Sequence, residues 1–318
     1  FHEAISWMIQ GVLWISRQSY GMLTIGHVPF LWVLLFYFMT GLWIWKKNGQ
    51  NRHIRISLAY VIMIILIWIP MARRKSLAFL DVGQGDCFVA DTKSGMIIFD
   101  GGSSSEDQVG RYRILPYMKY LGYQKIQIAV ISHMDIDHYS GIRELLEMGK
   151  IKYLGLPEIP KDETMKKIIG IAKKRGTTIF YLSRGRQITT KDGSLKVLHP
   201  QKNSQMEKNA ASLVMQGKIL GYRVLLTGDV EKEGEEELLS EELERADILK
   251  AAHHGSKNST SNEFLQKVQP KQTVISCGKQ NRYGHPHLET IHRLQTYRTK
   301  IYRTDRSGAI IFFKRRDG

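Results

Sequence analysis

Two long apolar blocks dominate the first quarter of the chain. The first, Val28–Trp45, runs for 18 positions without a charged residue, and a helix of that length can cross the roughly 30 Å hydrocarbon core of a bilayer. The second, Ile56–Pro70, has a length that also suits a buried helix, but its composition and its neighbour favour a membrane hairpin. A third stretch, Ala4–Ile15, is too short and too polar to span a bilayer. The pattern therefore predicts a transmembrane helical segment within residues 1–75.

The pattern changes at Ser76, where short β-type runs begin. Glycine-containing turns separate the first three, which predicts antiparallel neighbours: SLAFLDV, DCFVAD and MIIFD. The run IQIAVIS is apolar throughout, which predicts a strand buried on both faces. Later strands are expected in the segments LKVL, SLVMQ, YRVLLTGD, ADILKAAHHG, TVISCG and AIIFF.

Helical patterns separate these strands. The stretch RYRILPYMKYLG predicts a helix that ends at Gly122, and another is expected through Gly141–Met148. Thr164–Lys174 predicts an amphipathic helix with Ile168, Ile169 and Ile171 turned inward. An acidic helix is expected at Glu231–Leu243, and a last one from His287.

Two runs of strands, each with helices, predict an α/β fold. The expected architecture is a four-layer αββα sandwich, in which two sheets lie face to face and helices cover the outside. The change in pattern near Ala72–Ser76 marks the boundary, so the predicted domains are a membrane-spanning fragment at residues 1–75 and a folded domain at residues 76–318.

The chain of 318 residues carries a net charge of +16. Basic residues gather at Lys166–Arg175 and in the last twenty positions. This excess indicates an anionic partner, either nucleic acid or lipid headgroups, and the alternative is the solvated surface of a basic protein. The two cysteines, Cys87 and Cys277, lie in apolar runs and are expected to be buried thiols.

The short loop KKNGQNRHIR between the apolar blocks is basic. By the positive-inside rule it stays in the cytoplasm, which places the chain after residue 75 on the extracytoplasmic side of a cell membrane that the protein crosses more than once. The basic run Arg73–Lys75 argues against this orientation.

The segment SHMDIDHYSG holds four side chains that can bind metal within six positions: His133, Asp135, Asp137 and His138. Residues 133, 135 and 137 fall on one side of an extended chain, while 138 reaches across as the chain turns into a helix. One segment can therefore supply ligands to two ions, and ions about 3.5–4 Å apart stabilise both the attacking and the leaving oxygen of a phosphoryl displacement. The alternative is a polar helix cap, which does not require four such residues.

Two later strand ends carry further candidates. The segment LLTGD places Asp229 after an apolar strand, where an ordinary turn is the alternative. The segment ILKAAHHGS places His253 and His254 after another strand, and neither residue prefers such a position for packing.

Two loops add candidates for supporting roles. The segment NRYGHPHLET offers His285 and His287 before a helix, where one of them can serve as a cap instead. The segment LDVGQGD supplies Asp81 and Asp86, and Asp81 at a strand end can accept a hydrogen bond from a metal-binding histidine.

The motifs FLDVGQGD, IFDGG, SHMDIDH, LLTGD and HHGS, in this order, resemble the metallo-β-lactamase superfamily. Over residues 76–318 the chain is most similar to the C-terminal domain of ComEC-type proteins, the DNA internalisation channels of natural competence. The hydrophobic hairpin before it resembles the end of the membrane-spanning region of that family.

The resemblance implies a centre of two divalent ions, in which Asp229 bridges them and His253 or His254 completes the second position. The implied metal ligands are His133, Asp135, Asp137, His138, Asp229, His253 and His254.

This chain departs from the superfamily pattern at two points. Asp135 stands where the pattern HxHxDH has a histidine, and the added oxygen ligand favours Mn²⁺ or Mg²⁺ over Zn²⁺. The mid-domain histidine of the superfamily has no clear counterpart; His199 lies in that region, but Asn209 or Ser212 is expected on that strand.

The implied function is a nuclease that degrades one strand of incoming DNA during transformation. Proton transfer would fall to Asp137 or His254, with Asp81 in support, and the residues expected to contact substrate are His285, Lys257 and Asn209. Expected partners are the membrane, other DNA-uptake proteins and DNA bound without regard to sequence, because no helix-turn-helix or aromatic-rich single-strand platform is visible. Two alternatives are a non-catalytic docking module of the import channel and a metallohydrolase of small molecules.

Overall fold

The computed structural model describes residues 2–17, 24, 26–45, 57–58, 61, 74–206 and 209–314. The chain forms two compact units. One comprises Phe1–Arg73 with Lys119–Gln124, and the other comprises Arg74–Met118 with Lys125–Gly318.

The first unit contains the helices α1 (His2–Arg17) and α2 (Phe30–Trp45). The helix α2 coincides with the first apolar block, and side chains such as Phe30, Leu31 and Tyr37 are exposed along it. Within the described part of the chain, none of the helices combines the length and the apolar character needed to cross a bilayer. The second apolar block lies outside the described residues except for positions 57, 58 and 61. The transmembrane segment therefore stays a prediction.

The second unit is built on two seven-stranded sheets. The first sheet has the strand order β14-β1-β2-β3-β4-β5-β6. Its strands are β1 (Ser76–Phe79), β2 (Phe88–Thr92), β3 (Gly95–Phe99), β4 (Ile126–Val130), β5 (Ile151–Pro157), β6 (Thr178–Leu182) and β14 (Ile310–Phe313). The second sheet has the order β13-β12-β11-β10-β9-β8-β7. Its strands are β7 (Gln187–Thr190), β8 (Gly193–His199), β9 (Val214–Ile219), β10 (Tyr222–Leu226), β11 (Ile248–Lys250), β12 (Gln272–Ile275) and β13 (Lys300–Arg303).

Each sheet has an antiparallel half and a parallel half. The strands β14, β1, β2 and β3 pair antiparallel, as predicted for the first three runs, and β3 to β6 pair parallel. In the second sheet β7 to β10 pair antiparallel and β10 to β13 pair parallel. Loops that leave the carboxyl ends of parallel strands are common positions for ligand binding.

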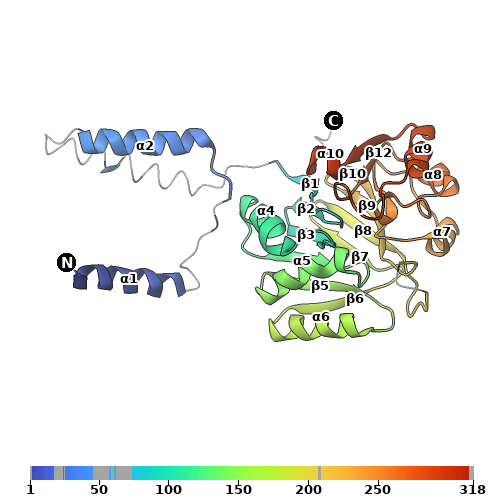
Figure 1. Ribbon diagram of the computed structural model, residues 1–318, viewed down its shortest axis with the longest axis horizontal. Coiled ribbons are helices and arrows are strands. Elements are labelled where there is room, and N and C mark those ends of the chain that lie inside the picture. Colours follow the sequence, from blue (N-terminus) through green and yellow to red (C-terminus); the bar gives the residue numbers. More distant parts are fainter. Residues whose placement is uncertain are drawn as a thin grey trace. The chain divides into compact units, whose positions relative to one another are not determined.

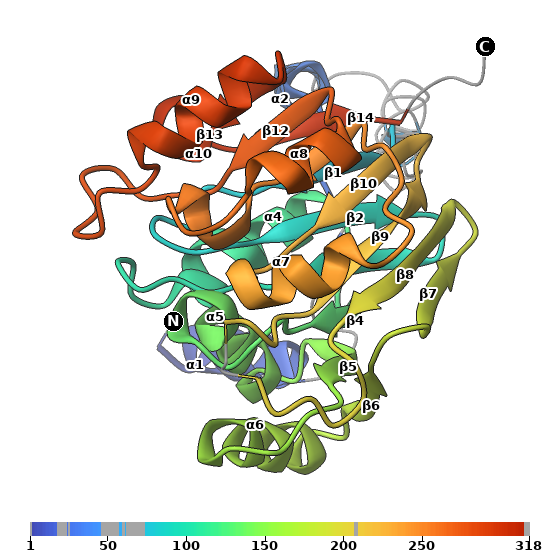
Figure 2. The same ribbon diagram turned by 90° about the vertical axis from the view of Figure 1, so that its right-hand side faces the viewer.

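Helices cover the outer faces of the sheets, so the layers follow the predicted order (Figures 1 and 2). Beside the first sheet lie a π-helical segment η1 (Gly110–Ile114), α4 (Leu115–Tyr120), α5 (Ile136–Glu147) and α6 (Glu163–Lys174). Beside the second lie α7 (Lys232–Leu239), a short 3₁₀ segment η2 (Ala252–Gly255), α8 (Asn262–Val268), α9 (Leu288–Thr296) and α10 (Thr304–Ser307). Side chains of α7, α8 and α9, including Leu238, Phe264 and Leu294, pack on Leu225, Leu249 and Ile275 of the second sheet.

Some elements differ from their prediction. The buried face of α6 is formed by Met165, Ile168 and Ala172, whereas Ile169 and Ile171 are half-buried. The helix turns 100° per residue, so positions i, i+3 and i+7 share a face and consecutive isoleucines do not. The acidic helix is also shorter than expected and ends at Leu239.

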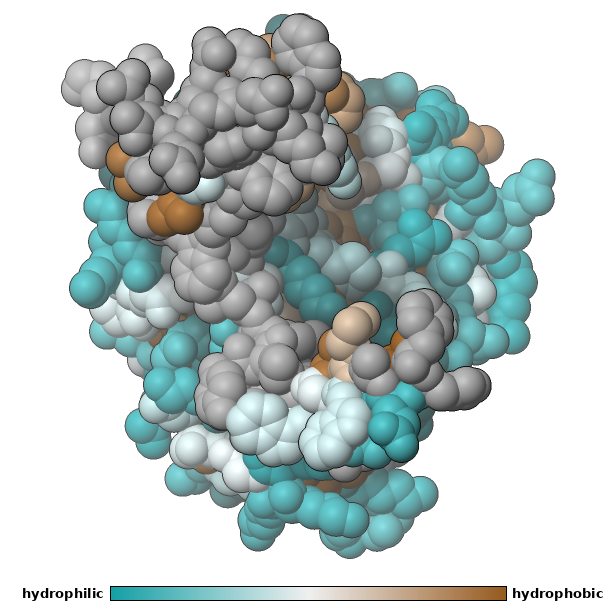
Figure 3. Space-filling model, turned by 90° about the vertical axis from the view of Figure 1, so that its left-hand side faces the viewer, coloured by the Kyte–Doolittle hydropathy of each residue, from teal (hydrophilic) through white to brown (hydrophobic). Residues whose placement is uncertain are grey.

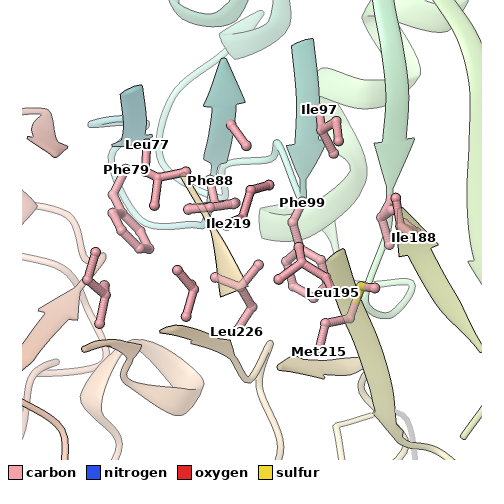
Figure 4. Packing of buried hydrophobic residues seen from close by; sticks show 14 of the residues in the cluster. Leu77, Phe79, Phe88, Ile97, Phe99, Ile188, Leu195, Met215, Ile219 and Leu226 are labelled. Atoms are coloured by element: carbon pink, nitrogen blue, oxygen red, sulfur yellow. The ribbon is translucent and has the colours of Figure 1, made fainter. Parts of the chain in front are cut away.

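The main core lies between the two sheets. Leu77, Phe79, Phe88, Ile97 and Phe99 of the first sheet face Ile188, Leu195, Met215, Ile219 and Leu226 of the second (Figure 4). Alternate positions of one strand share a face, which is why Leu77 and Phe79 both enter this core. Full burial of one such side chain contributes about 1.5–3 kcal/mol.

A buried polar contact connects the two sheets beside this core. Lys250 ends β11 of the second sheet and is only 4% exposed. Its ammonium group forms an ion pair with Asp86, which lies in the loop between β1 and β2 of the first sheet. The same Nζ atom lies 3.6 Å from Asp229 Oδ1 and donates a hydrogen bond to the carbonyl of Gly228.

Replacing Lys250 with methionine is expected to lower the free energy of unfolding by about 3–5 kcal/mol, because two buried carboxylates would lose their counter-charge. Urea unfolding in buffer containing a chelator measures this loss. The matched control is Lys166→Met, because Lys166 pairs with Glu163 at the surface, with side chains 57% and 79% exposed. That change should cost about 1 kcal/mol or less. Equal stability of Lys250→Met and the unaltered protein would contradict the role of Lys250.

Candidate metal centre

The HMDIDH motif leaves the carboxyl end of β4 and enters α5. His133 and Asp135 precede the helix, while Asp137 and His138 lie in its first turn because α5 begins at Ile136. The prediction that residues 133, 135 and 137 share an extended segment is therefore wrong for Asp137. Asp135 occupies the N-cap position, but its side chain makes no capping hydrogen bond.

Side chains from both sheets converge on the carboxylate of Asp229, which follows β10. Asp229 Oδ2 lies 3.2 Å from His138 Nε2 and 3.4 Å from His254 Nε2. His254 Nε2 in turn lies 3.4 Å from Asp137 Oδ2. These four residues, which come from α5, the end of β10 and η2, form the centre of the site.

Both central imidazoles are oriented by partners at their Nδ1 atoms. His254 Nδ1 donates to the carbonyl of Ser276 at 2.9 Å, and His138 Nδ1 lies 3.0 Å from Asp100 Oδ2. These contacts leave the Nε2 atoms facing Asp229. Hydrogen-bonded imidazoles of this kind, with one nitrogen held and the other presented, are typical of metal-binding histidines.

Asp86 belongs to the same cluster, but its carboxylate lies on the Nδ1 side of the two imidazoles. Ligand atoms of Asp86, His138, Asp229 and His254 all lie within 4.8 Å of one another. The Asp86 oxygens, however, approach the Nδ1 atoms, at 3.8 Å from His138 and 3.6 Å from His254. They also form the ion pair with Lys250. Asp137 therefore approaches the cluster from the Nε2 side of His254, whereas Asp86 approaches it from the Nδ1 side.

Among the described residues, several buried side-chain nitrogen and oxygen atoms of this site have no hydrogen-bond partner, including His133 Nε2, His138 Nε2, His254 Nε2 and Asp229 Oδ1. A buried polar atom without a partner costs about 1–3 kcal/mol, so such atoms are rarely left unpaired without a role. Imidazole nitrogens and carboxylate oxygens are ligands for divalent transition metals. The donor set therefore fits a divalent metal ion.

The electrostatics of the centre favour a cation. Burial opposes the charged forms of His138 and His254, but the carboxylate of Asp229 outweighs it and raises the pKa of both well above the usual range. Burial likewise opposes ionisation of Asp229, yet the two imidazoles hold its pKa well below the usual range. Burial also opposes ionisation of Asp137, yet the neighbouring imidazole of His254 lowers its pKa.

A second group of donors lies beside His138. His133 Nε2 is 3.6 Å from Asp135 Oδ2, and the His133 ring lies 4.1 Å from the His138 ring. His199 does not reach this position, because its Nε2 atom lies 2.6 Å from the carbonyl of Ala210 and its Nδ1 atom lies 3.3 Å from Glu237. Ser212 instead accepts the backbone N–H of Asp229 at 3.3 Å. This position therefore has fewer donors than the one around Asp229.

The backbone around the two adjacent histidines is strained. His253 and His254 have φ angles of +47° and +52°, in the left-handed region that non-glycine residues rarely adopt. Residues held in this region cost about 1–3 kcal/mol and cluster at functional sites. The strain places the two rings differently: His254 is buried at the centre, whereas His253 lies at the rim, with Nδ1 2.7 Å from Glu231 and Nε2 3.9 Å from Asp229.

The centre opens into a cavity of about 410 Å³. Its lining residues are Gln84, Ser104, Asp135, Ile136, Asp137, Asn209, Asp229, His253, His254, Tyr283 and His285. Burial and then the charges of His254 and His253 lower the pKa of His285 to about 4, so its imidazole is neutral near pH 7. Of the residues predicted to contact substrate, Asn209 and His285 line this cavity.

Three other candidates lie elsewhere. Lys257 lines a separate cavity of about 690 Å³ beside α7 and α8. His287 is the N-cap of α9, and its Nδ1 atom accepts the backbone N–H of Lys257. Asp81 accepts the N–H of Gly83 within its own loop, so the place expected for it beside a histidine belongs to Asp100.

Sequence reasoning missed Asp100 and Lys250, and it named Asp86 without giving it a definite role. Asp86 and Asp100 belong to the motifs LDVGQGD and IFDGG, and the glycines there are a usable signal. A Cβ atom added to Gly102 would lie 2.5 Å from the backbone nitrogen of His138. Only glycine at position 102 therefore lets the DGG segment come so close to the first turn of α5. This close approach brings Asp100 to His138.

Comparison with known proteins agrees with this geometry. The family model of the metallo-β-lactamase superfamily matches residues 80–279. ComE operon protein 3 of Bacillus subtilis (strain 168) is 33% identical across 100% of this chain and 44% of its own length. Competence protein ComA of Neisseria gonorrhoeae is 30% identical across 75% of this chain and 32% of its own length. The chain thus spans less than half the length of these relatives.

A solved structure shows the same fold. The metallo-β-lactamase fold protein YhfI from Bacillus subtilis superposes with a TM-score of 0.51 at 12% identity, over 74% of this chain and 99% of that chain. The competence relatives confirm the resemblance to ComEC-type proteins that the motifs predicted. The matched family model includes the HMDIDH segment as well as Asp229 and His254. The chain belongs to the metallo-β-lactamase superfamily.

Proposed function

We propose that residues 76–318 form a metal-dependent phosphodiesterase that cleaves DNA during its uptake into the cell. The observation that carries this proposal is the convergence of His138, His254, Asp137 and Asp229 on one point at the floor of an open cavity. The similarity to competence proteins supports DNA as the substrate.

The residues that would hold a first ion are Asp137, His138, Asp229 and His254. A second ion would be held by His133, Asp135 and a shared Asp229, with fewer ligands. The carboxylates favour Mn²⁺ or Mg²⁺, with Zn²⁺ as the alternative. When bound, such an ion lowers the pKa of water and stabilises charge on a leaving oxygen.

The chain itself orients these ligands and handles protons. Asp100 and the Ser276 carbonyl fix the two imidazole rings. His254 is 1% exposed and its Nδ1 atom is bonded to the Ser276 carbonyl, so it is poorly placed to exchange protons with solvent. Asp137, whose side chain is 16% exposed, and the neutral His285 face the cavity and are better placed for proton transfer to and from substrate oxygens.

The net charge of +16 supports binding to the DNA backbone. Much of the described surface in the face shown in Figure 3 is hydrophilic. Contacts of this kind carry no sequence information and weaken steeply with salt. We place the apolar segment within residues 1–75 in the cell membrane and residues 76–318 on the extracytoplasmic side, where incoming DNA and other uptake proteins would meet it.

Metal binding is testable without any substrate. Saturating Mn²⁺ should raise the melting temperature of the chelator-treated chain, because an ion at about 100 times its Kd adds about 2.7 kcal/mol of stability. His254→Ala should lose most of this increase, while His292→Ala, which removes an exposed imidazole on α9, should retain it. An equal increase in both variants, measured by differential scanning fluorimetry, would refute the assigned centre.

Cleavage is tested with labelled single-stranded and duplex DNA in the presence of Mn²⁺. Asp137→Asn should lower the rate at least about 100-fold, because it removes one ligand and one proton acceptor at once. The control Asp107→Asn alters an exposed carboxylate in the loop before η1, and this variant should cleave DNA at the normal rate. Retained cleavage in Asp137→Asn would mean that the activity does not arise at this centre.

A second function is favoured by one observation. The position beside His133 and Asp135 has fewer donors than the position around Asp229. An incomplete second metal position is what we expect of a domain that binds DNA without cleaving it. Salt-sensitive DNA binding without cleavage under any divalent ion would favour this alternative over the nuclease.

A further inference from the structure

Two exposed apolar side chains border the cavity above the metal centre. Ile136, the first residue of α5, is 53% exposed, and Tyr283, in the loop between β12 and α9, is 42% exposed. Both line the cavity together with Asp137, His254 and His285. Ile136 belongs to a helix that follows a strand of the first sheet, and Tyr283 to a loop that follows a strand of the second. Covering such exposed apolar groups with an apolar ligand removes their surface from water, which is favourable.

Tyr283 is held in place from several directions. Its ring stacks on His285 at 5.7 Å with an interplanar angle of 21°. Its hydroxyl accepts a hydrogen bond from Arg282, whose guanidinium lies 4.8 Å from the ring centre. A side chain ordered before binding loses less entropy when it contacts a ligand.

The loop that carries Tyr283 is also fixed. Asn281 Nδ2 donates to the carbonyls of Gly278 and His285, at 2.9 Å and 2.6 Å. Asn281 Oδ1 accepts the backbone N–H of His285 at 2.9 Å. One asparagine thereby closes the turn and keeps Tyr283 and His285 on the cavity side.

We propose that Tyr283 and Ile136 form a subsite for an unpaired nucleobase next to the bond that is cleaved, with Arg282 available to the adjoining phosphate. This inference rests on the proposed action on DNA and specifies its substrate. Aromatic rings stack on bases of any identity, while a base inside a duplex has both faces covered by its neighbours. The cavity volume of about 410 Å³ lies in the range of sites that hold small organic groups. The preferred substrate is therefore a single strand or a frayed end.

The test measures binding without cleavage, by fluorescence anisotropy with the full chain in EDTA at low salt. The probes are a labelled oligothymidylate, an abasic strand of the same length and a blunt duplex. Tyr283→Ala should weaken oligothymidylate binding roughly 5- to 100-fold, the range expected for loss of one base–aromatic contact. Binding of the abasic strand should stay unchanged. Tyr283→Phe and Tyr283→Trp should bind oligothymidylate as well as the unaltered chain, and Ile136→Ala should show a smaller loss.

The matched control is Tyr112→Ala, because Tyr112 is 64% exposed on η1 and does not line the cavity. It should bind all three probes normally. If Tyr283→Ala weakens both strands equally, or neither, the base subsite is refuted. A base-dependent loss in a chain that cleaves no DNA with Mn²⁺ would refute the nuclease and retain the subsite, while cleavage with no base-dependent loss would do the reverse.

Discussion

The structure depends on an imbalance of charge buried between its two sheets. Asp86, Asp100, Asp137 and Asp229 bring four carboxylates to one region, and Lys250 brings an ammonium group that contacts two of them. Such an excess of negative charge is costly in a medium of low polarity unless cations or hydrogen bonds offset it. The fold tolerates it by presenting two imidazoles and, as we propose, a divalent ion.

The architecture was largely predictable, because two runs of short strands with intervening helices admit few arrangements. The strand-end motifs also named Asp137, His138, Asp229 and the histidine pair, whose side chains the structure brings close together; their role as metal ligands stays a proposal. Strands such as β5 and β13 were missed. Both mix charged or aromatic residues with apolar ones, as in IKYLGLP and KIYR, so their alternation is weak. Their identity is decided by parallel pairing with a neighbour, at β4 and β12, which is a long-range property.

The chemistry of the site was less predictable for the same reason. Lys250 ends an apolar strand and would be expected to reach solvent; only the approach of Asp86 from the other sheet makes it an internal counter-charge. The order His253-His254 does not reveal which ring enters the centre, because two consecutive left-handed residues rotate the chain there. Lys257 is close to these histidines in sequence, yet η2 turns it toward α7 and α8. A single tyrosine on a loop forms no aromatic pattern in the sequence, so the sequence does not predict the contact that we propose between Tyr283 and a base.

The division of the ligands between the two sheets has a consequence for the making of the protein. The ribosome synthesises the HMDIDH segment long before it synthesises Asp229, His254 and Ser276. These three residues follow strands of the second sheet. A nascent chain that ends before β10 has only half of a centre and no counter-charge from Lys250. The domain therefore acquires its hydrolytic potential late, after the second sheet has been synthesised and has docked on the first. An incomplete chain, whether stalled or cut by a protease, lacks the part of the donor set that the second sheet supplies.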